Sequence, residues 1–326
     1  MAAFAEGTPC WVDVALPDLA AGRRFYGELF GWSFPSPPDV PARGVRERAA
    51  GGATNGFTPA LLGDDPVAGL LQKSDGRMPT VWTVYFATSD AVATAARVRA
   101  AGGWVITDPV PAVPGPAAVT ALAADPSGAV FGLWQPGERE GFARSGVPGS
   151  YAWSEVHTRD TDAVDTFYAD VFGHQVQELG GEDFDFAVWY PAGEPLDEEY
   201  AIGGRAMIGD TLPVEMPAHF LTYFAVTDCD ATVRRVRNLG GRTMTPPETT
   251  PYGRFAVLVD NQGAVFAVLD TATTAERATP AVPSAVAAGE SADPAGPAPE
   301  AGSESARDRE RPAAGEGPGA GGAKGT

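Results

Sequence analysis

The sequence predicts an α+β protein of two tandem domains, each containing two βαβββ modules whose helices lie on one side of a curved sheet. Three observations support this fold class. A long segment repeats within the chain, each copy alternates short strand-like runs with single helices, and the composition changes abruptly after Asp270. A chain of 326 residues also has the length of about two domains. We expect the first domain at residues 8–136, a linker at 137–149 and the second domain at 150–270.

The internal repeat is the strongest of these signals. Residues 11–32 align with residues 153–174 at an offset of 142, and eight of the 22 positions are identical. A second block containing Tyr-Phe and a double glycine recurs at an offset of 138, and a Gly-Ala-Val-Phe block recurs at 135. Because three blocks recur in the same order, we interpret them as a duplicated domain.

Each copy also reads as two similar halves. Strand-like runs have β-branched and alternating residues, and each helix has an aspartate at its start and a glycine at its end. In the first copy the pattern predicts, in order, a strand at 11–16, a helix at 19–30, strands at 56–62 and 67–72, a strand at 80–88, a helix at 90–103, and strands at 104–107, 118–124 and 130–135.

The segment from Thr271 to Thr326 contains no Phe, Trp, Tyr, Ile or Leu. It cannot bury enough apolar surface to offset its conformational entropy, so we expect a disordered Ala/Pro/Gly/Glu-rich tail. The net charge of -19 argues against nucleic acid and anionic membranes as partners. Two distant cysteines, Cys10 and Cys229, and the lack of a signal peptide or an 18-residue apolar run favour a cytoplasmic protein.

The motifs resemble those of the vicinal oxygen chelate superfamily, which includes glyoxalases, bleomycin-resistance proteins and dioxygenases. The sequence FYGELFGW at 25–32 is similar to the opening of one of its modules, and DPSGAVFGLWQP at 125–136 and DNQGAVFAVLD at 260–270 are similar to the end. Within the superfamily, the chain resembles tandem-domain actinobacterial proteins of glyoxalase-like or hydroxylase type. The resemblance implies that each domain folds its curved mixed sheet into a cup. Fold alone does not imply function.

The resemblance also implies where a metal would bind, because metal-dependent members hold a divalent ion in the cup with His, Glu or Gln. At the matching positions this sequence has Trp11, Thr83 and Gly132, then Trp153, Leu221 and Ala267, with Gln72 as the remaining possibility. Indole, glycine and alkyl side chains offer no lone pair to a metal. We therefore expect neither a metal nor another cofactor. A slip of two residues would instead bring in Asp13, or Glu155 and His219, as a rebuilt metal site.

Strand alternation predicts which side chains face each cup. Both sets combine an indole, a carboxylate and a tyrosine with a small residue at the place of the metal-binding glutamate, which would open volume for a ligand. The expected ligand-binding residues are Trp11, Tyr85, Trp134, Trp153, His157, His219 and Tyr223. Trp11 and Trp153 could equally fill their cups as core residues. His174 follows Gly173, which ends the predicted helix of the second domain, and we expect it at the surface.

The candidate catalytic residues are Asp13 and Glu155, because a carboxylate beside an indole can have a raised pKa and act as a general base. Equally, either could only hydrogen-bond its neighbours. Three functions follow. The favoured one is metal-independent binding of a small organic molecule. The alternatives are an enzyme of lyase, isomerase or hydroxylase/dioxygenase type, and a stress or regulatory protein acting through protein contacts. The two domains should pair within one chain, which gives a monomer or a homodimer.

Overall fold

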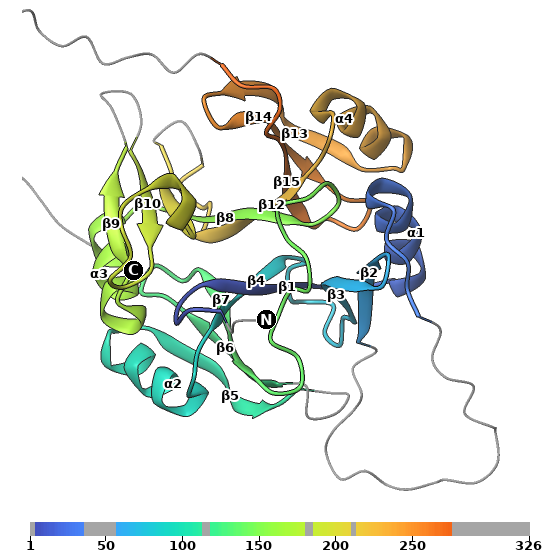
Figure 1. Cartoon of the computed structure of the whole chain (residues 1–326). Helices are drawn as coiled ribbons and strands as arrows, with labels where there is room; N and C mark the ends of the chain where they lie inside the picture. Colours follow the sequence, from blue (N-terminus) through green and yellow to red (C-terminus); the bar gives the residue numbers. More distant parts are fainter. Residues whose placement is uncertain (1–3, 36–56, 113–117, 180–184, 210–212, 276–326) are drawn as a thin grey trace, which may run out of the picture. The chain divides into compact units, whose positions relative to one another are not determined.

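The computed structural model (Figure 1) describes residues 4–35, 57–112, 118–179, 185–209 and 213–275. The expected disordered tail lies outside the described residues, apart from residues 271–275. Of the strand expected at 56–62, residue 56 alone lies outside the described residues.

Residues 9–136 build one seven-stranded mixed sheet, in the order β2-β3-β1-β4-β7-β6-β5. Its strands pair in both parallel and antiparallel directions, with β1 parallel to β3 and antiparallel to β4. The elements are β1 (Pro9–Leu16), α1 (Leu19–Phe30), β2 (Thr58–Leu62), β3 (Asp65–Gln72), β4 (Trp82–Ala87), α2 (Ala91–Ala100), β5 (Trp104–Pro111), β6 (Ala118–Ala124) and β7 (Val130–Pro136).

Residues 151–270 build the other sheet, which has eight strands in the order β13-β14-β15-β12-β8-β11-β10-β9. Both of its halves are complete βαβββ modules. The elements are β8 (Tyr151–Thr158), α3 (Thr161–Phe172), β9 (Gln175–Glu178), β10 (Phe186–Tyr190), the short 3-10 helix η1 (Glu198–Tyr200), β11 (Gly203–Met207), β12 (His219–Ala225), α4 (Cys229–Asn238), β13 (Arg242–Thr250), β14 (Gly253–Val259) and β15 (Val265–Asp270).

The predicted fold class is confirmed, including both helix starts of the first domain. Asp18 caps α1 by accepting from the Ala21 N–H, and Asp90 caps α2 in the same way. Gly31 ends α1 with a φ of 75°, a left-handed conformation that favours glycine. The strand expected at 104–107 is longer and runs to Pro111, because its pairing with β6 continues past an irregularity after Thr107.

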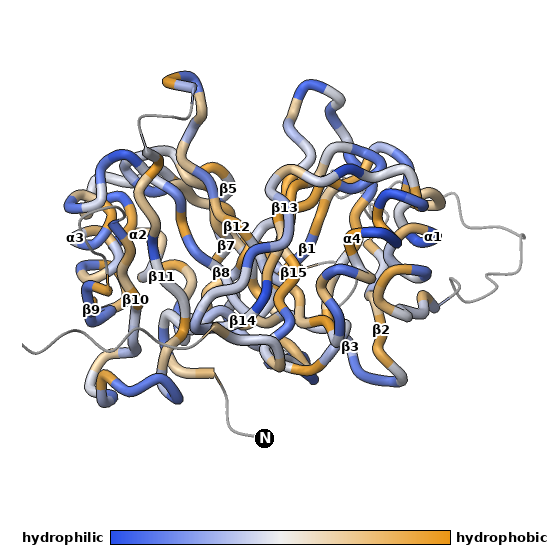
Figure 2. The backbone as a smooth tube through the Cα atoms, turned by 90° about the horizontal axis from the view of Figure 1, so that it is seen from above, coloured by the Kyte–Doolittle hydropathy of each residue, from blue (hydrophilic) through white to orange (hydrophobic). Residues whose placement is uncertain are grey.

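The two sheets pack against each other through aromatic side chains on their helix-bearing faces. Phe86 of β4 lies 5.8 Å from Phe220 of β12, and Trp82 lies 4.9 Å from Phe224, measured between ring centroids. Figure 2 shows α1 beside α4 and α2 beside α3, so each helix of one domain neighbours a helix of the other. The face of each sheet away from this core forms the inside of a cup.

Hydrogen bonds across this interface come in equivalent pairs. The Tyr26 hydroxyl donates to Asp260 over 2.9 Å, and the equivalent Tyr168 hydroxyl donates to Asp125 over 3.4 Å. Both aspartates are buried at the turn before the Gly-Ala-Val-Phe block. Each domain therefore contributes one tyrosine and one aspartate to the other.

A second pair follows the helix ends. Trp32 donates its indole N–H to the Gly149 carbonyl at 2.6 Å, and Nε2 of His174 bonds the Gly7 carbonyl at 2.9 Å. The expectation of a surface His174 is therefore wrong: its side chain is only 4% exposed. It lies among Tyr168, Phe172 and Trp189 because the helix end it follows points into the interface rather than into solvent.

Among the described residues, no helix is long and apolar enough to cross a membrane.

Candidate functional site

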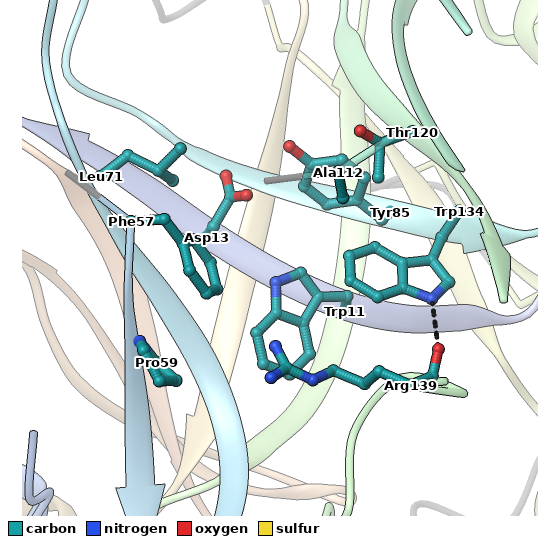
Figure 3. A pocket seen from close by; sticks show the side chains of 10 residues that line it. All are labelled: Trp11, Asp13, Phe57, Pro59, Leu71, Tyr85, Ala112, Thr120, Trp134 and Arg139. Carbon is teal, nitrogen blue, oxygen red and sulfur yellow. Dashed lines mark hydrogen bonds between the residues drawn. The ribbon is translucent and has the colours of Figure 1, made fainter. Parts of the chain in front are cut away.

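The first cup contains a cavity of about 210 Å³ on the face of the first sheet that turns away from the helices (Figure 3). Strand pairing explains how its residues meet. Trp11 lies opposite Tyr85 on β4, and Tyr85 lies beside Gly132 on β7. The cavity is lined by Trp11, Asp13, Phe57, Pro59, Leu71, Tyr85, Ala112, Thr120, Trp134 and Arg139. The structure thus brings four predicted site residues together, namely Trp11, Asp13, Tyr85 and Trp134.

Two indoles form the main wall of this cavity. The rings of Trp11 and Trp134 lie 5.6 Å apart with an angle of 32° between their planes. Trp134 donates its N–H to the Arg139 carbonyl at 3.3 Å, whereas the buried N–H of Trp11 has no hydrogen-bond partner among the described residues. A buried unpaired donor is costly in a folded protein. Trp11 lines the cavity and is also part of the core, because its side chain is 0% exposed. A ligand would reach its N–H only after a neighbouring side chain moves.

Asp13 supplies the carboxyl group of the first cup. It is 8% exposed, and burial raises its pKa to about 7, an effect that hydrogen bonding with the Tyr85 side chain opposes in part. Burial, and then the neighbouring Asp13 charge, also hold the pKa of the Tyr85 hydroxyl well above its usual value. Near neutral pH the Asp13 carboxyl is therefore present in both its neutral and its charged form, so it can donate or accept a proton.

Arg139 and Phe142 come from the segment expected to be only a linker. The Arg139 guanidinium lies 5.5 Å from the centroid of the Trp11 ring, within the range of a cation–π contact. Burial lowers its pKa. Phe142 packs 5.8 Å from Trp11 and 4.8 Å from Tyr151, stacked on the latter. Their sequence neighbourhood of glycine and charged residues carries no periodic pattern, so sequence reasoning missed both residues.

The residues at the superfamily's metal positions do not fit a metal ion. The space above Gly132 is occupied by the Tyr85 ring: a Cβ at this glycine would lie 2.0–2.5 Å from three ring atoms. Gln72 instead donates to the backbone carbonyl of Pro17 at 2.8 Å. Within the described part of the chain, no group of three or more His, Cys, Asp or Glu residues is placed to hold a metal. The donors present are therefore unsuited to the family's ion.

The second cup holds the equivalent positions with different chemistry. Trp153 pairs with Tyr223, Glu155 with Leu221, and His157 with His219 across β8 and β12. Ala267 of β15 lies beside Tyr223. Leu221, Tyr223 and Ala267 form an apolar cluster separate from the main core, against which Trp153 packs while staying partly exposed.

Glu155 is the centre of the polar part of this cup. It is 8% exposed and its Oε1 accepts a hydrogen bond from the Tyr223 hydroxyl at 2.8 Å. The same oxygen lies 3.0 Å from Nε2 of His157. Burial and the Glu155 charge hold the pKa of Tyr223 well above its usual value. The His157 and His219 rings stack 5.1 Å apart, and burial lowers the pKa of His219.

Comparison with known proteins agrees with the resemblance drawn from the motifs. Residues 10–133 match the model of the Glyoxalase/Bleomycin resistance protein/Dioxygenase superfamily. The chain is 37% identical over 272 residues to "Anthracycline biosynthesis protein DauV" of Streptomyces sp. (strain C5), which covers 83% of this chain and 95% of that protein.

Two solved structures share the fold. The Mn(II)-bound glyoxalase from Novosphingobium aromaticivorans has a TM-score of 0.53 and 17% identity, over 83% of this chain and 85% of that one. The 2,2',3-trihydroxybiphenyl 1,2-dioxygenase from Sphingomonas wittichii strain RW1 has a TM-score of 0.54 and 12% identity, over 81% and 90% of the two chains. At these identities the likeness concerns the fold alone.

Proposed function

The chain belongs to the glyoxalase/bleomycin resistance protein/dioxygenase superfamily, and from this premise we propose that its first cup binds a small aromatic molecule without a metal. The cavity beside Trp11 carries this proposal, because it combines two indole walls with an unpaired buried N–H. Apolar walls with a few polar groups are typical of small-molecule sites.

The polar groups define what the ligand should offer. The Trp11 N–H is only a donor, so it requires a ligand oxygen or other acceptor. Asp13 accepts from a ligand hydroxyl when charged and donates to a ligand oxygen when neutral. A cavity of about 210 Å³ is below the roughly 300–1,000 Å³ usual for drug-sized ligands. The ligand is therefore small, or a larger ligand inserts only one end.

The similarity to a protein named for anthracycline biosynthesis supports a fused-ring aromatic as the first ligand to test. Such a ring system would stack on Trp11 and Trp134, and its oxygen substituents would meet the Trp11 N–H and Asp13. Aromatic pairs of this kind contribute about 0.5–1.5 kcal/mol beyond their buried area.

Isothermal titration with anthracyclines, simpler hydroxylated quinones and phenols tests this function in the full chain. We expect Trp11→Phe, which removes the N–H and part of the wall, to weaken binding at least tenfold. The equivalent Trp153→Phe in the second cup is the matched control and should leave this binding unchanged. Failure of the whole panel to bind, or equal loss from both variants, would contradict a binding site in the first cup.

A second candidate is catalysis by proton transfer, and the raised pKa of Asp13 specifically favours it. A general base works best when its pKa lies near the working pH, and burial raises that of Asp13 to about 7. Mass spectrometry of ligands incubated with the protein would reveal conversion. If Asp13 is the base, Asp13→Asn should abolish conversion while binding persists. Unchanged ligands would leave binding as the function of this cup, whereas unchanged turnover in the variant would show that Asp13 is not the base.

A further inference from the structure

The second cup presents three polar atoms without a partner within the described residues. These atoms are Oε2 of Glu155, Nδ1 of His157 and Nε2 of His219, none of which takes part in the hydrogen bonds of this cup. They share one face of the sheet, because His157 and His219 pair directly and Glu155 is two residues from His157 on the same strand.

The hydrogen bonds already made decide whether these atoms donate or accept. Nδ1 of His219 lies 2.9 Å from the Pro217 carbonyl, which can only accept. Nδ1 therefore carries the proton, and Nε2 of the neutral ring is an acceptor.

The same reasoning applies to His157. Oε1 of Glu155 accepts from the Tyr223 hydroxyl, so this oxygen is also the acceptor for the ring. In a neutral His157 ring, Nε2 is then the donor and Nδ1 is the second free acceptor. With Oε2 of Glu155, the cup offers three acceptors and no free donor among these groups.

We propose that the second cup binds the protonated amino group of a small primary amine. An ammonium group has three N–H donors and no acceptor, which complements three acceptors, one of them on a carboxylate. Trp153 and Tyr223 lie next along the same strands and add aromatic faces that attract a cation or hold an apolar substituent. This ligand is distinct from that of the first cup, and the inference does not depend on it.

A metal ion would also bind to acceptors, but the arrangement favours the amine. The His157 and His219 rings are stacked with only 16° between their planes. The oxygen of Glu155 nearest His157 is already shared between two donors. A metal ion takes His and Glu ligands at about 2.0–2.2 Å, and no three His, Cys, Asp or Glu side chains of the described residues are placed to do so. An ammonium takes its acceptors at about 2.8–3.0 Å, so the acceptors around it stand further apart.

The first experiment titrates the full chain with 2-phenylethylamine and with 2-phenylethanol, which replaces the ammonium by a hydroxyl. We expect the amine to bind at least tenfold more tightly than the alcohol. Glu155→Gln should weaken amine binding at least tenfold, whereas Asp13→Asn in the first cup should not change it. Equal binding of amine and alcohol, or loss of amine binding in Asp13→Asn rather than in Glu155→Gln, would overturn the proposal.

Proton NMR of the imidazole rings gives a second readout that does not depend on a variant that folds. The chain has only three histidines, and His174 lies outside both cups. The amine should shift the His157 and His219 signals and leave that of His174 unchanged. Shifts confined to His174, or no shifts at all, would contradict an amine site in this cup.

Discussion

Equivalent residues of the two domains behave differently in the interface and in the cups. In the interface, Tyr26 and Tyr168 bond to equivalent aspartates, and Trp32 and His174 bond to the equivalent carbonyls of Gly149 and Gly7. In the cups, Asp13 corresponds to Glu155, but the first is beside a cavity of indole and tyrosine, whereas the second bonds a histidine.

This contrast has a physical cause. Each interface bond joins one domain to the other, so a change in one copy leaves a buried partner unpaired in the other. The cups lie on the opposite faces of the two sheets, and within the described part of the chain no such hydrogen bond joins them. Each cup can therefore change its side chains without cost to the other, and the duplication could retain its scaffold while acquiring two different sites.

The largest effect should come from the carboxyl group of the first cup. Burial raises the Asp13 pKa from 3.8 to about 7, so folding favours its neutral form. The contribution of Asp13 to the free energy of unfolding is fully present below its unfolded pKa of 3.8 and is lost as the pH rises to about 7. At about 1.36 kcal/mol per pKa unit, the loss is up to about 4 kcal/mol. Asp13→Asn, which stays neutral, should be more stable than the parent at pH 8, as measured by urea unfolding.

The same variant at pH 4 is its own control. There the Asp13 carboxyl of the parent is largely neutral, so the substitution should change the free energy of unfolding by no more than about 1 kcal/mol. A stability difference that is equal at pH 4 and pH 8 would show that ionisation of Asp13 does not oppose folding.

The next largest effect comes from His174 in the interface, whose contribution to stability is lost as the pH falls and not as it rises. Burial lowers the His174 pKa from 6.5 to about 4, so folding disfavours its charged form. Stability from this group is present above pH 6.5 and is lost as pH falls to 4, by up to about 3 kcal/mol. His174→Phe keeps the aromatic packing and should remove this acid-dependent loss, although it costs about 1 kcal/mol at pH 7 for the bond to Gly7.

The Asp13 and His174 contributions oppose each other over the same pH range, so only the variants separate them. In urea unfolding, Trp32→Phe is the matched control at the equivalent position. It loses the bond to Gly149 but removes no titrating group, so its cost should not depend on pH. An acid-dependent loss that persists in His174→Phe would assign it to another group.

Much of the fold and part of the first cup could be predicted from the sequence. Strand alternation placed Trp11, Asp13, Tyr85 and Trp134 on one face, because period-two patterns determine the face directly. It could not place His174, because the direction of a chain beyond a helix end depends on the partner domain. It also missed Arg139, whose segment folds against the cup only through tertiary contacts.

The sequence also predicted open volume at Gly132, the position of the superfamily's metal-binding glutamate, and this too depends on a tertiary contact. Gly132 lacks a side chain, but the Tyr85 ring lies over it, and a Cβ there would come within 2.0 Å of that ring. Gly132→Ala should therefore cost about 2–3 kcal/mol and weaken ligand binding, because the ring must move toward the cavity. The measurements are urea unfolding and titration with the best ligand of the first cup.

The matched change in the second cup is Ala267→Gly, because Ala267 lies beside Tyr223 as Gly132 lies beside Tyr85. It removes one buried methyl and should cost about 1 kcal/mol without affecting the first cup. Tyr85→Ala removes the ring that a Cβ at position 132 would overlap. Gly132→Ala should therefore cost less in the Tyr85→Ala variant than in the parent. Independent, additive costs would mean that the ring and the added methyl do not meet.

The smallest effect tests how equal the two halves of the interface are. Tyr26→Phe removes two buried hydrogen bonds, because the hydroxyl donates to Asp260 at 2.9 Å and accepts from the Trp82 N–H at 3.1 Å. Tyr168→Phe removes only a longer bond of 3.4 Å to Asp125, and both aspartates keep the backbone N–H bonds of their own turns. We expect costs of about 2 and about 1 kcal/mol in urea unfolding. Equal costs would mean that the Trp82 bond adds nothing, whereas a larger cost for Tyr168→Phe would show that the second domain depends more strongly on the shared interface than the first.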